Sequence, residues 1–335
     1  MTVDSSRPVL DVRNLTVEFH TGRGPVTAVR DVSFRLDRGE ALGILGESGS
    51  GKSVTAGAIM GILETPPARI TGGQVLLNGE DLLNMPAKER RVLMGSTISM
   101  VFQDTLTALN PVHPVGRQIA ELYQVHRGLT RRAAHTRAVE MMELVSIPDA
   151  ARRSKDHPHQ FSGGMRQRIM IALALALDPD VLIADEPTTA LDVTVQAQVL
   201  DLLGRQQTER DMGLILITHD LAVAAEVTDR IGVMYAGAFV EFGATGDVLE
   251  RPAHPYSRGL AASVIGAVHE GRRLPAIPGQ HPDLRRMPSG CAFHTRCSLA
   301  ETVCRQDRPD LLQVADRTAG VRLSACHFSQ EGALR

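Results

Sequence analysis

Residues 46–53 read Gly-Glu-Ser-Gly-Ser-Gly-Lys-Ser, and no other stretch of the chain limits its possible folds as strongly. They match the pattern G-x-x-x-x-G-K-[ST], follow a short apolar strand expected at residues 41–45, and precede a helix-forming run at residues 54–62. Glycines let consecutive backbone N–H groups face one anion at a helix N-terminus. A glycine-rich turn with an incidental lysine would not need this strand–loop–helix order. The sequence therefore predicts a phosphate-binding loop in an α/β protein with a mostly parallel sheet.

The polar groups of this loop suit a nucleoside triphosphate. The lysine adds a point charge toward the β- and γ-phosphates, and the hydroxyl of the last serine suits Mg²⁺. The candidate nucleotide-binding residues of the loop are Gly46, Ser48, Gly49, Ser50, Gly51, Lys52 and Ser53, the last of them also a magnesium ligand.

A phosphate loop needs a carboxylate on the metal side, and the apolar strand expected at residues 181–184 ends in one. Asp185 and Glu186 follow this strand directly, where open α/β sheets place their ligand sites. We expect Asp185 to act on the Mg²⁺ side and Glu186 to accept a proton from the attacking water. The alternative is an acid pair that only caps the next helix.

Three further features restrict which kind of nucleotide-binding protein the sequence predicts. Ser162, Gly163 and Gly164 precede a helix expected at residues 165–177 and form a second candidate anion site. One nucleotide does not need two such sites from one chain, so the second indicates two chains paired head to tail. Gln103 and His219 each follow a strand, the first as a neutral ligand for Mg²⁺ or water. Taken singly, each would more often be a surface or turn residue.

The order of these motifs resembles that of the ATP-binding cassette (ABC) ATPases across residues 9–250. The resemblance implies a RecA-like core, an antiparallel β subdomain and a helical subdomain that carries the second anion site. It also implies that ATP lies between the phosphate loop of one subunit and residues 162–164 of another. Asp192 would lie at that interface, His219 near the γ-phosphate, and Phe19 against adenine. Phe19 reads equally well as a core residue of a strand.

Composition restricts the remaining classes. The chain has 335 residues, a net charge of −2 and 43% hydrophobic residues, which suits about two soluble globular domains. This charge gives no general attraction to polyanions, so a nucleic-acid partner is not expected. The longest apolar run, residues 169–177, is too short to cross a bilayer, and residues 1–12 lack the pattern of a secretory signal.

We place a domain boundary near Glu250, with an ABC ATPase domain at residues 1–250 and an extension at 251–335. The stretches 251–260, 277–279 and 291–297 resemble the extension of dipeptide/oligopeptide importer ATPases. That resemblance implies a peripheral subunit at the cytoplasmic face of the membrane that powers peptide import. Its implied partners are two permease subunits, a second and distinct ATPase, and an extracytoplasmic solute-binding protein. A nickel chelate or glutathione remains an alternative cargo, because selectivity lies in the other subunits.

All four cysteines of the chain fall in this extension, at Cys291, Cys297, Cys304 and Cys326. Their spacing lacks the paired C-x₂-C knuckles of structural zinc sites. The resemblance implies a [4Fe–4S] cluster here, which four irregularly spaced thiolates can hold. Zinc, with His294 and His327 as further ligands, and unliganded thiols or disulfides stay open. A different class also stays open, a non-transport ABC ATPase whose extension senses a metal or redox state.

Overall fold

The computed structural model describes residues 7–104, 108–189, 191–265, 277–314 and 321–329. The chain divides into two compact units. Unit 1 contains Asn84–Ile215 and Asp37–Glu40, and unit 2 contains Leu10–Leu36, Ala41–Leu83 and the chain from Leu216 onward. In the described part of the chain, no helix is both long and apolar enough to cross a membrane.

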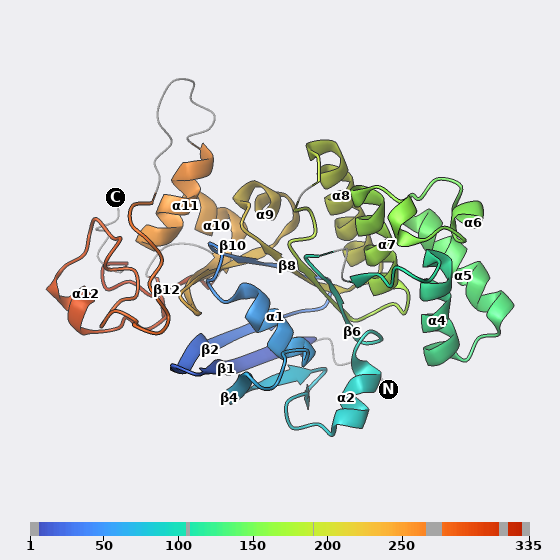
Figure 1. The fold of residues 1–335 in the computed structure, drawn as a ribbon. Helices are drawn as coiled ribbons and strands as arrows, with labels where there is room; N and C mark the ends of the chain where they lie inside the picture. The colour runs from blue at the N-terminus through green and yellow to red at the C-terminus, as the bar shows by residue number, and fades with distance from the viewer. Residues whose placement is uncertain (1–6, 105–107, 190, 266–276, 315–320, 330–335) are drawn as a thin grey trace. The chain divides into compact units, whose positions relative to one another are not determined.

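Unit 2 contains an antiparallel sheet with the strand order β2-β1-β4-β5 (Figure 1). Its strands are β1 (Leu10–Thr21), β2 (Gly24–Leu36), β4 (Ala68–Leu77) and β5 (Glu80–Asp81). In β1 the buried face passes from Leu10 and Val12 to Leu15 and Val17, because the register shifts at Asn14, where φ is 50°. A bulge of this kind moves the inward positions by one residue.

The phosphate loop follows β3 (Ala41–Leu45), a strand of a second sheet in unit 2. Strand β3 pairs in parallel with β9 (Arg230–Tyr235), which pairs antiparallel with β10 (Ala238–Ala244). Two short strands from the extension, β12 (Leu323–Ser324) and β11 (Leu312–Gln313), continue this sheet beyond β10. The helices of unit 2 are α1 (Lys52–Met60), α9 (Leu221–Val227), α10 (Thr245–Glu250), α11 (Pro255–Ile265) and α12 (Thr302–Gln306).

The extension shares its core with this sheet. Leu45, the last residue of β3, belongs to one buried apolar cluster with Tyr235 of β9, Tyr256 of α11 and Phe293 of the extension. The segments of the extension that carry Tyr256 and Phe293 thus pack on the strand that leads into the phosphate loop. The boundary near Glu250 stays a prediction about domain organisation, since these residues lie in one compact unit.

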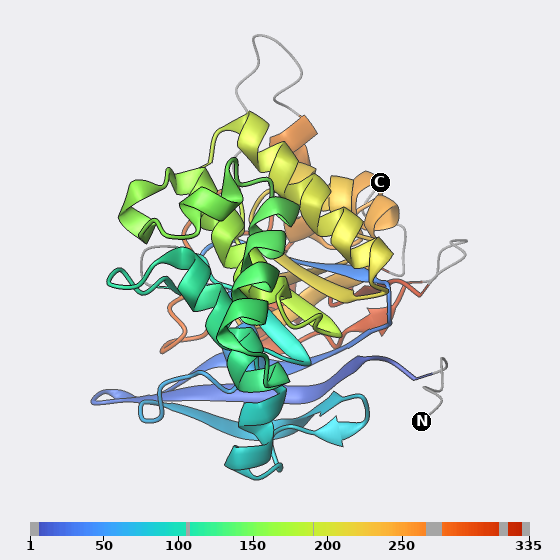
Figure 2. The same cartoon turned by 90° about the vertical axis from the view of Figure 1, so that its right-hand side faces the viewer.

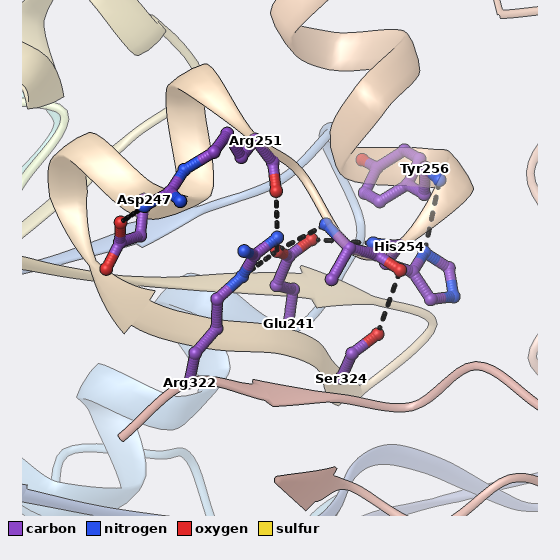
Figure 3. Close-up of polar contacts among 8 residues, drawn as sticks. Glu241, Asp247, Arg251, His254, Tyr256, Arg322 and Ser324 are labelled. Carbon is purple, nitrogen blue, oxygen red and sulfur yellow. Dashed lines mark hydrogen bonds and ion pairs between the residues drawn. The ribbon is translucent and has the colours of Figure 1, made fainter. Parts of the chain in front are cut away.

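A buried ion pair attaches the extension to β10 (Figure 3). Nη2 of Arg322 lies 3.3 Å from Oε1 of Glu241, and the two side chains are 5% and 0% exposed. Glu241 also accepts hydrogen bonds from the backbone N–H groups of Ala253 at 2.8 Å and His254 at 2.9 Å. Burial raises the pKa of Glu241, while these hydrogen bonds and the charge of Arg322 oppose the rise. The extension therefore supplies both the cation and the two backbone donors that compensate this buried carboxylate.

Unit 1 combines parallel strands with a group of helices. Its strands β6 (Ile98–Val101) and β7 (Val181–Asp185) pair in parallel, and β8 (Gly213–Thr218) lies where the two units divide. Helices α4, α5 and α7 pack against one another (Figures 1 and 2). The helices of unit 1 are α2 (Ala87–Leu93), α4 (Val115–Arg127), α5 (Arg131–Leu144), α6 (Ala150–Arg153), the 3₁₀ turn Pro158–Gln160, α7 (Gly163–Leu175) and α8 (Val193–Glu209).

Candidate nucleotide-binding site

The phosphate loop lies between β3 and α1 and has a backbone that requires glycine. Gly46 has φ of 152°, and a Cβ there would meet the carbonyl oxygen of Met234 at 2.3 Å. Gly51 has φ of 107°, and its Cβ would lie 2.7 Å from the carbonyl oxygen of Ala28. At Gly49, with φ of 80°, an added Cβ would have no atom within 4 Å. The loop therefore packs tightly against β2 and β9 at its ends and has open space at its middle, as a cradle for an anion requires.

Two polar side chains of the loop are buried. Lys52 is 5% exposed, and its Nζ donates to the carbonyl oxygens of Gly46 at 2.7 Å and Glu47 at 3.1 Å. The hydroxyl of Ser50 is fully buried and has no hydrogen-bond partner among the described residues. A buried hydroxyl without a partner is costly, and a phosphate oxygen would supply one. Ser48 and Ser53 are exposed. The residues of the loop thus fit a bound triphosphate.

Gln103 and Glu186 lie together in unit 1, as the ends of two neighbouring parallel strands require. Nε2 of Gln103 donates to Oε2 of Glu186 at 3.0 Å, and the hydroxyl of Thr189 donates to the same oxygen at 2.9 Å. Glu186 has a positive φ of 47°, which is uncommon outside glycine. Asp185, the last residue of β7, is 4% exposed. Carboxylate, amide and hydroxyl oxygens are the ligand types that Mg²⁺ prefers.

The predicted second anion site lies at the start of α7. The hydroxyl of Ser162 accepts from the N–H of Met165 at 3.4 Å and caps this helix. Gly163 has open space at its Cβ position, whereas a Cβ at Gly164 would lie 2.8 Å from Cγ1 of Val195. Asp192 likewise caps α8. These contacts are what helix caps make, and they leave the roles of these residues in nucleotide binding as predictions.

His219 and Phe19 lie in unit 2. His219 directly follows β8 and is exposed. Phe19 lies on β1, pairs with Val26 and Ala68 in the neighbouring strands, and is only half-buried, whereas Val17 of the same strand is fully buried. Part of its ring is therefore left outside the core.

The four cysteines are free thiols that line one small cavity of the extension, together with His254, His294 and His327. Burial, with a smaller contribution from the neighbouring cysteines, raises the pKa of Cys291 to about 11, against the opposing effect of a hydrogen bond from the N–H of Phe293. Burial also raises the pKa of Cys297 and Cys326, and each has an opposing hydrogen bond from the backbone N–H two residues later.

This donor set has the chemistry of a thiolate-ligated group, since backbone N–H groups directed at sulfur are how proteins tune such ligands. Within the described ranges, however, no three His, Cys, Asp or Glu side chains are arranged to hold a metal ion. His294 and His327 each direct one ring nitrogen to a backbone carbonyl, at Cys291 and Asp307 respectively, both at 2.9 Å.

One set of contacts at the phosphate loop was not predicted from the sequence. The carboxylate of Glu47 pairs with Arg296 and His281, and its backbone N–H donates to the hydroxyl of Tyr256 at 2.9 Å. Glu47 occupies a variable position of the motif, and Arg296 lies 249 residues further along the chain. The only local signal was the place of Arg296 in the stretch that resembles importer extensions, directly before Cys297.

Comparison with known proteins finds relatives for both the phosphate-loop region and the extension. Residues 29–189 match the ABC transporter family, and residues 240–304 match the C-terminal region of oligopeptide/dipeptide transporters. The dipeptide transport ATP-binding protein DppD of Bacillus subtilis (strain 168) is 50% identical over 301 residues, which cover 90% of this chain and 90% of that protein. The oligopeptide transport ATP-binding protein OppD of Salmonella typhimurium is 49% identical over 301 residues, which cover 90% and 89%.

Solved structures give the same result for the fold. The dimeric structure of a bacterial ABC transporter cassette matches with a TM-score of 0.62 and 27% identity, over 69% of this chain and 96% of that one. The dimeric structure of a post-hydrolysis state of that cassette, bound to ADP and Pi, matches with a TM-score of 0.64 and 26% identity, over 70% and 98%. The predicted cassette fold is confirmed, and the chain belongs to the ATP-binding subunits of ABC transporters, in their oligopeptide/dipeptide branch.

Proposed function

We propose that this chain hydrolyses ATP to power the import of peptides through an ABC transporter. The hydrogen bond between Gln103 and Glu186 carries the hydrolytic part, because it holds an amide and a carboxylate together where a water must be oriented and deprotonated. The match of the extension to oligopeptide/dipeptide transporters supports the cargo class.

In this proposal the phosphate loop binds the triphosphate through its backbone N–H groups, the hydroxyl of Ser50 and the ammonium group of Lys52. Ser53, Asp185 and Gln103 would hold Mg²⁺, which when bound neutralises charge on the phosphate oxygens. Glu186 accepts a proton from the attacking water, Gln103 orients that water, and His219 stabilises the γ-phosphate. Phe19 stacks on the base with the part of its ring that lies outside the core.

Closure of two ATPase subunits over the nucleotides completes the site. Ser162, Gly163 and Gly164 of one subunit, with Asp192, contact the ATP held by the other, where the N-terminus of α7 favours an anion. The chain then works at the cytoplasmic face of the membrane with two permease subunits, a second and distinct ATPase, and a solute-binding protein.

The test is reconstitution of the intact complex in vesicles. Peptide uptake that requires external binding protein and internal MgATP, and that is lost in Glu186→Gln, supports the proposal. ATP hydrolysis that di- and oligopeptides never stimulate, but a nickel chelate or glutathione does, would leave the ATPase in place and overturn the cargo.

For the cysteine cavity we propose a [4Fe–4S] cluster. Its support is the gathering of four thiols around one cavity and the backbone N–H groups directed at three of their sulfurs. Anaerobic purification with iron and sulfide analysis decides this, and zinc without iron would refute the cluster.

A further inference from the structure

The extension contacts the phosphate loop at Glu47. Nη1 of Arg296 donates to Oε2 of Glu47 at 2.7 Å, and Nη2 donates to Oε1 at 3.1 Å. His281 contacts the same carboxylate. A two-pronged contact of this kind fixes the orientation of the carboxylate as well as its position.

The arginine itself has little freedom to move. Its side chain is 4% exposed, and its Nε donates to the carbonyl oxygen of Pro278 at 2.9 Å. Its guanidinium carbon lies 5.8 Å from the centre of the Tyr235 ring and 5.9 Å from that of Phe293. Because this guanidinium is buried and hydrogen-bonded at two edges, the position of the segment that carries Arg296 determines the position of the Glu47 carboxylate.

The backbone of Glu47 is held as well. The hydroxyl of Tyr256 accepts its N–H at 2.9 Å, and Tyr256 is fully buried with its ring 4.7 Å from that of Tyr235. On the other side, the carbonyl oxygen of Glu47 accepts from Nζ of Lys52 at 3.1 Å. One residue therefore links the extension to the lysine that is expected to reach the phosphates.

We propose that Arg296 is a positioning residue for nucleotide binding, which sets the conformation of the phosphate loop through Glu47. The proposal rests on the proposed binding of ATP by this loop. It also gives the cysteine-bearing segment a function, because Arg296 directly precedes Cys297, whose thiol lines the cysteine cavity. The order of that segment is thereby coupled to the affinity of the loop for ATP.

The experiment measures the Kd of a fluorescent ATP analogue with Mg²⁺ for the purified full chain. Arg296→Met is expected to raise Kd at least about tenfold, because loss of the fork leaves the Glu47 carboxylate without its main partner. Arg296→Lys keeps the positive charge but cannot donate two parallel hydrogen bonds, and it is expected to recover part of the affinity for the ATP analogue. Glu47→Gln is expected to give a similar loss, and the double variant Glu47→Gln/Arg296→Met no more than either single one.

Arg285→Met is the matched control, because Arg285 makes a similar two-pronged pair with Asp283, from Nε to Oδ1 and from Nη2 to Oδ2, but is exposed. Its Kd should stay within about twofold of the unchanged chain. A folded Arg296→Met chain with unchanged Kd, or effects of Glu47→Gln and Arg296→Met that add in full, would overturn the proposal. A lower Tm with unchanged Kd would assign Arg296 a purely structural role.

If Arg296→Met does not fold, Arg296→Lys and Glu47→Asp decide. Each keeps its charge but disrupts the two-pronged contact between Arg296 and Glu47, and unchanged Kd in both would overturn the proposal. Because Kd is measured without transport, the outcome is separate from that of the proposed function. A chain that binds ATP but never drives peptide uptake would refute the proposed peptide cargo. The role of Arg296 would still be decided by the Kd values of its variants.

Discussion

Gln103 and Glu186 are joined by a hydrogen bond of 3.0 Å from Nε2 to Oε2, although 83 residues separate them in the sequence. The contact follows from topology, since β6 and β7 are parallel neighbours and each residue comes just after the last residues of its strand. Side chains at the carboxyl ends of adjacent parallel strands share one edge of the sheet.

Glu186→Gln is expected to lower kcat for ATP hydrolysis by a factor of about 10² to 10⁴, because the amide cannot accept the proton of the water. The Kd for ATP should stay nearly unchanged, and a closed dimer should accumulate. Phosphate release and size-exclusion chromatography with MgATP measure both. Glu140→Gln, in an exposed pair with Arg137 on α5, is the control. Undiminished hydrolysis in Glu186→Gln would remove the assignment of the base.

Gly46→Ala is expected to abolish ATP binding and to lower Tm. Its Cβ would lie 2.3 Å from the backbone oxygen of Met234, and this backbone cannot move without shifting β9. Gly22→Ala, where no atom lies within 4 Å of the added Cβ, is the matched control and should bind ATP normally. Fluorescent-nucleotide titration and a thermal melt check both variants. Normal ATP binding by Gly46→Ala would mean that the loop does not need this close approach.

Arg322→Met is expected to destabilise the chain by about 3 to 5 kcal/mol, because it leaves the carboxylate of Glu241 buried without its cation. Urea unfolding followed by circular dichroism measures the loss. Arg251→Met removes a pair with Asp247 whose arginine is 59% exposed, and should cost no more than about 1 kcal/mol. Equal losses in the two variants would contradict the importance of burial.

The free energy of unfolding is expected to depend on pH because of His254. Burial lowers its pKa to about 3, and its Nδ1 accepts the N–H of Tyr256 at 3.1 Å, so the folded chain holds it neutral. The unfolded chain takes up a proton below pH 6.5, the usual pKa of histidine. This contribution to stability is therefore complete above pH 6.5 and is lost at about 1.4 kcal/mol per pH unit as the pH falls toward 3.

His254→Asn, whose amide oxygen can accept the same N–H, should flatten the fall in unfolding free energy between about pH 7.5 and about pH 4.5, where the histidine of the unfolded chain becomes protonated. Urea unfolding at several pH values provides the comparison, with exposed His159→Asn as the control. Identical pH profiles for the His254→Asn variant and the unchanged chain would show that His254 is protonated alike in both states.

The local motifs could be predicted because their geometry is set by neighbours in the sequence. The helix after the phosphate loop, expected at residues 54–62, is α1, and it ends where Gly61 adopts a left-handed φ of 64°. Helix α5 likewise has a local start signal, because the hydroxyl of Thr130 accepts from the N–H of Ala133 and caps it. The helix expected at residues 165–177 begins earlier, at Gly163, because Ser162 caps it.

The contacts of the extension could not be predicted in this way. Glu47 with Arg296 and Glu241 with Arg322 are pairs distant in sequence, and no local pattern selects one arginine among many as the partner of a given acid. The register of β12 on β10, which brings Arg322 to Glu241, depends on packing of the whole unit. Sequence motifs were enough to predict candidate residues for nucleotide binding, whereas the contacts that support the phosphate loop could be found only in the three-dimensional structure.

The pairing of Glu241 with Arg322 also determines when, during synthesis of the chain, this unit can finish folding. A nascent chain on the ribosome contains both halves of the nucleotide machinery long before residue 322 emerges, yet the carboxylate in its core still lacks its counterion. Folding of this unit is therefore completed only after residue 322 has been synthesised. A chain that stops before residue 322 keeps this carboxylate in its interior without the cation, which favours its removal by proteases.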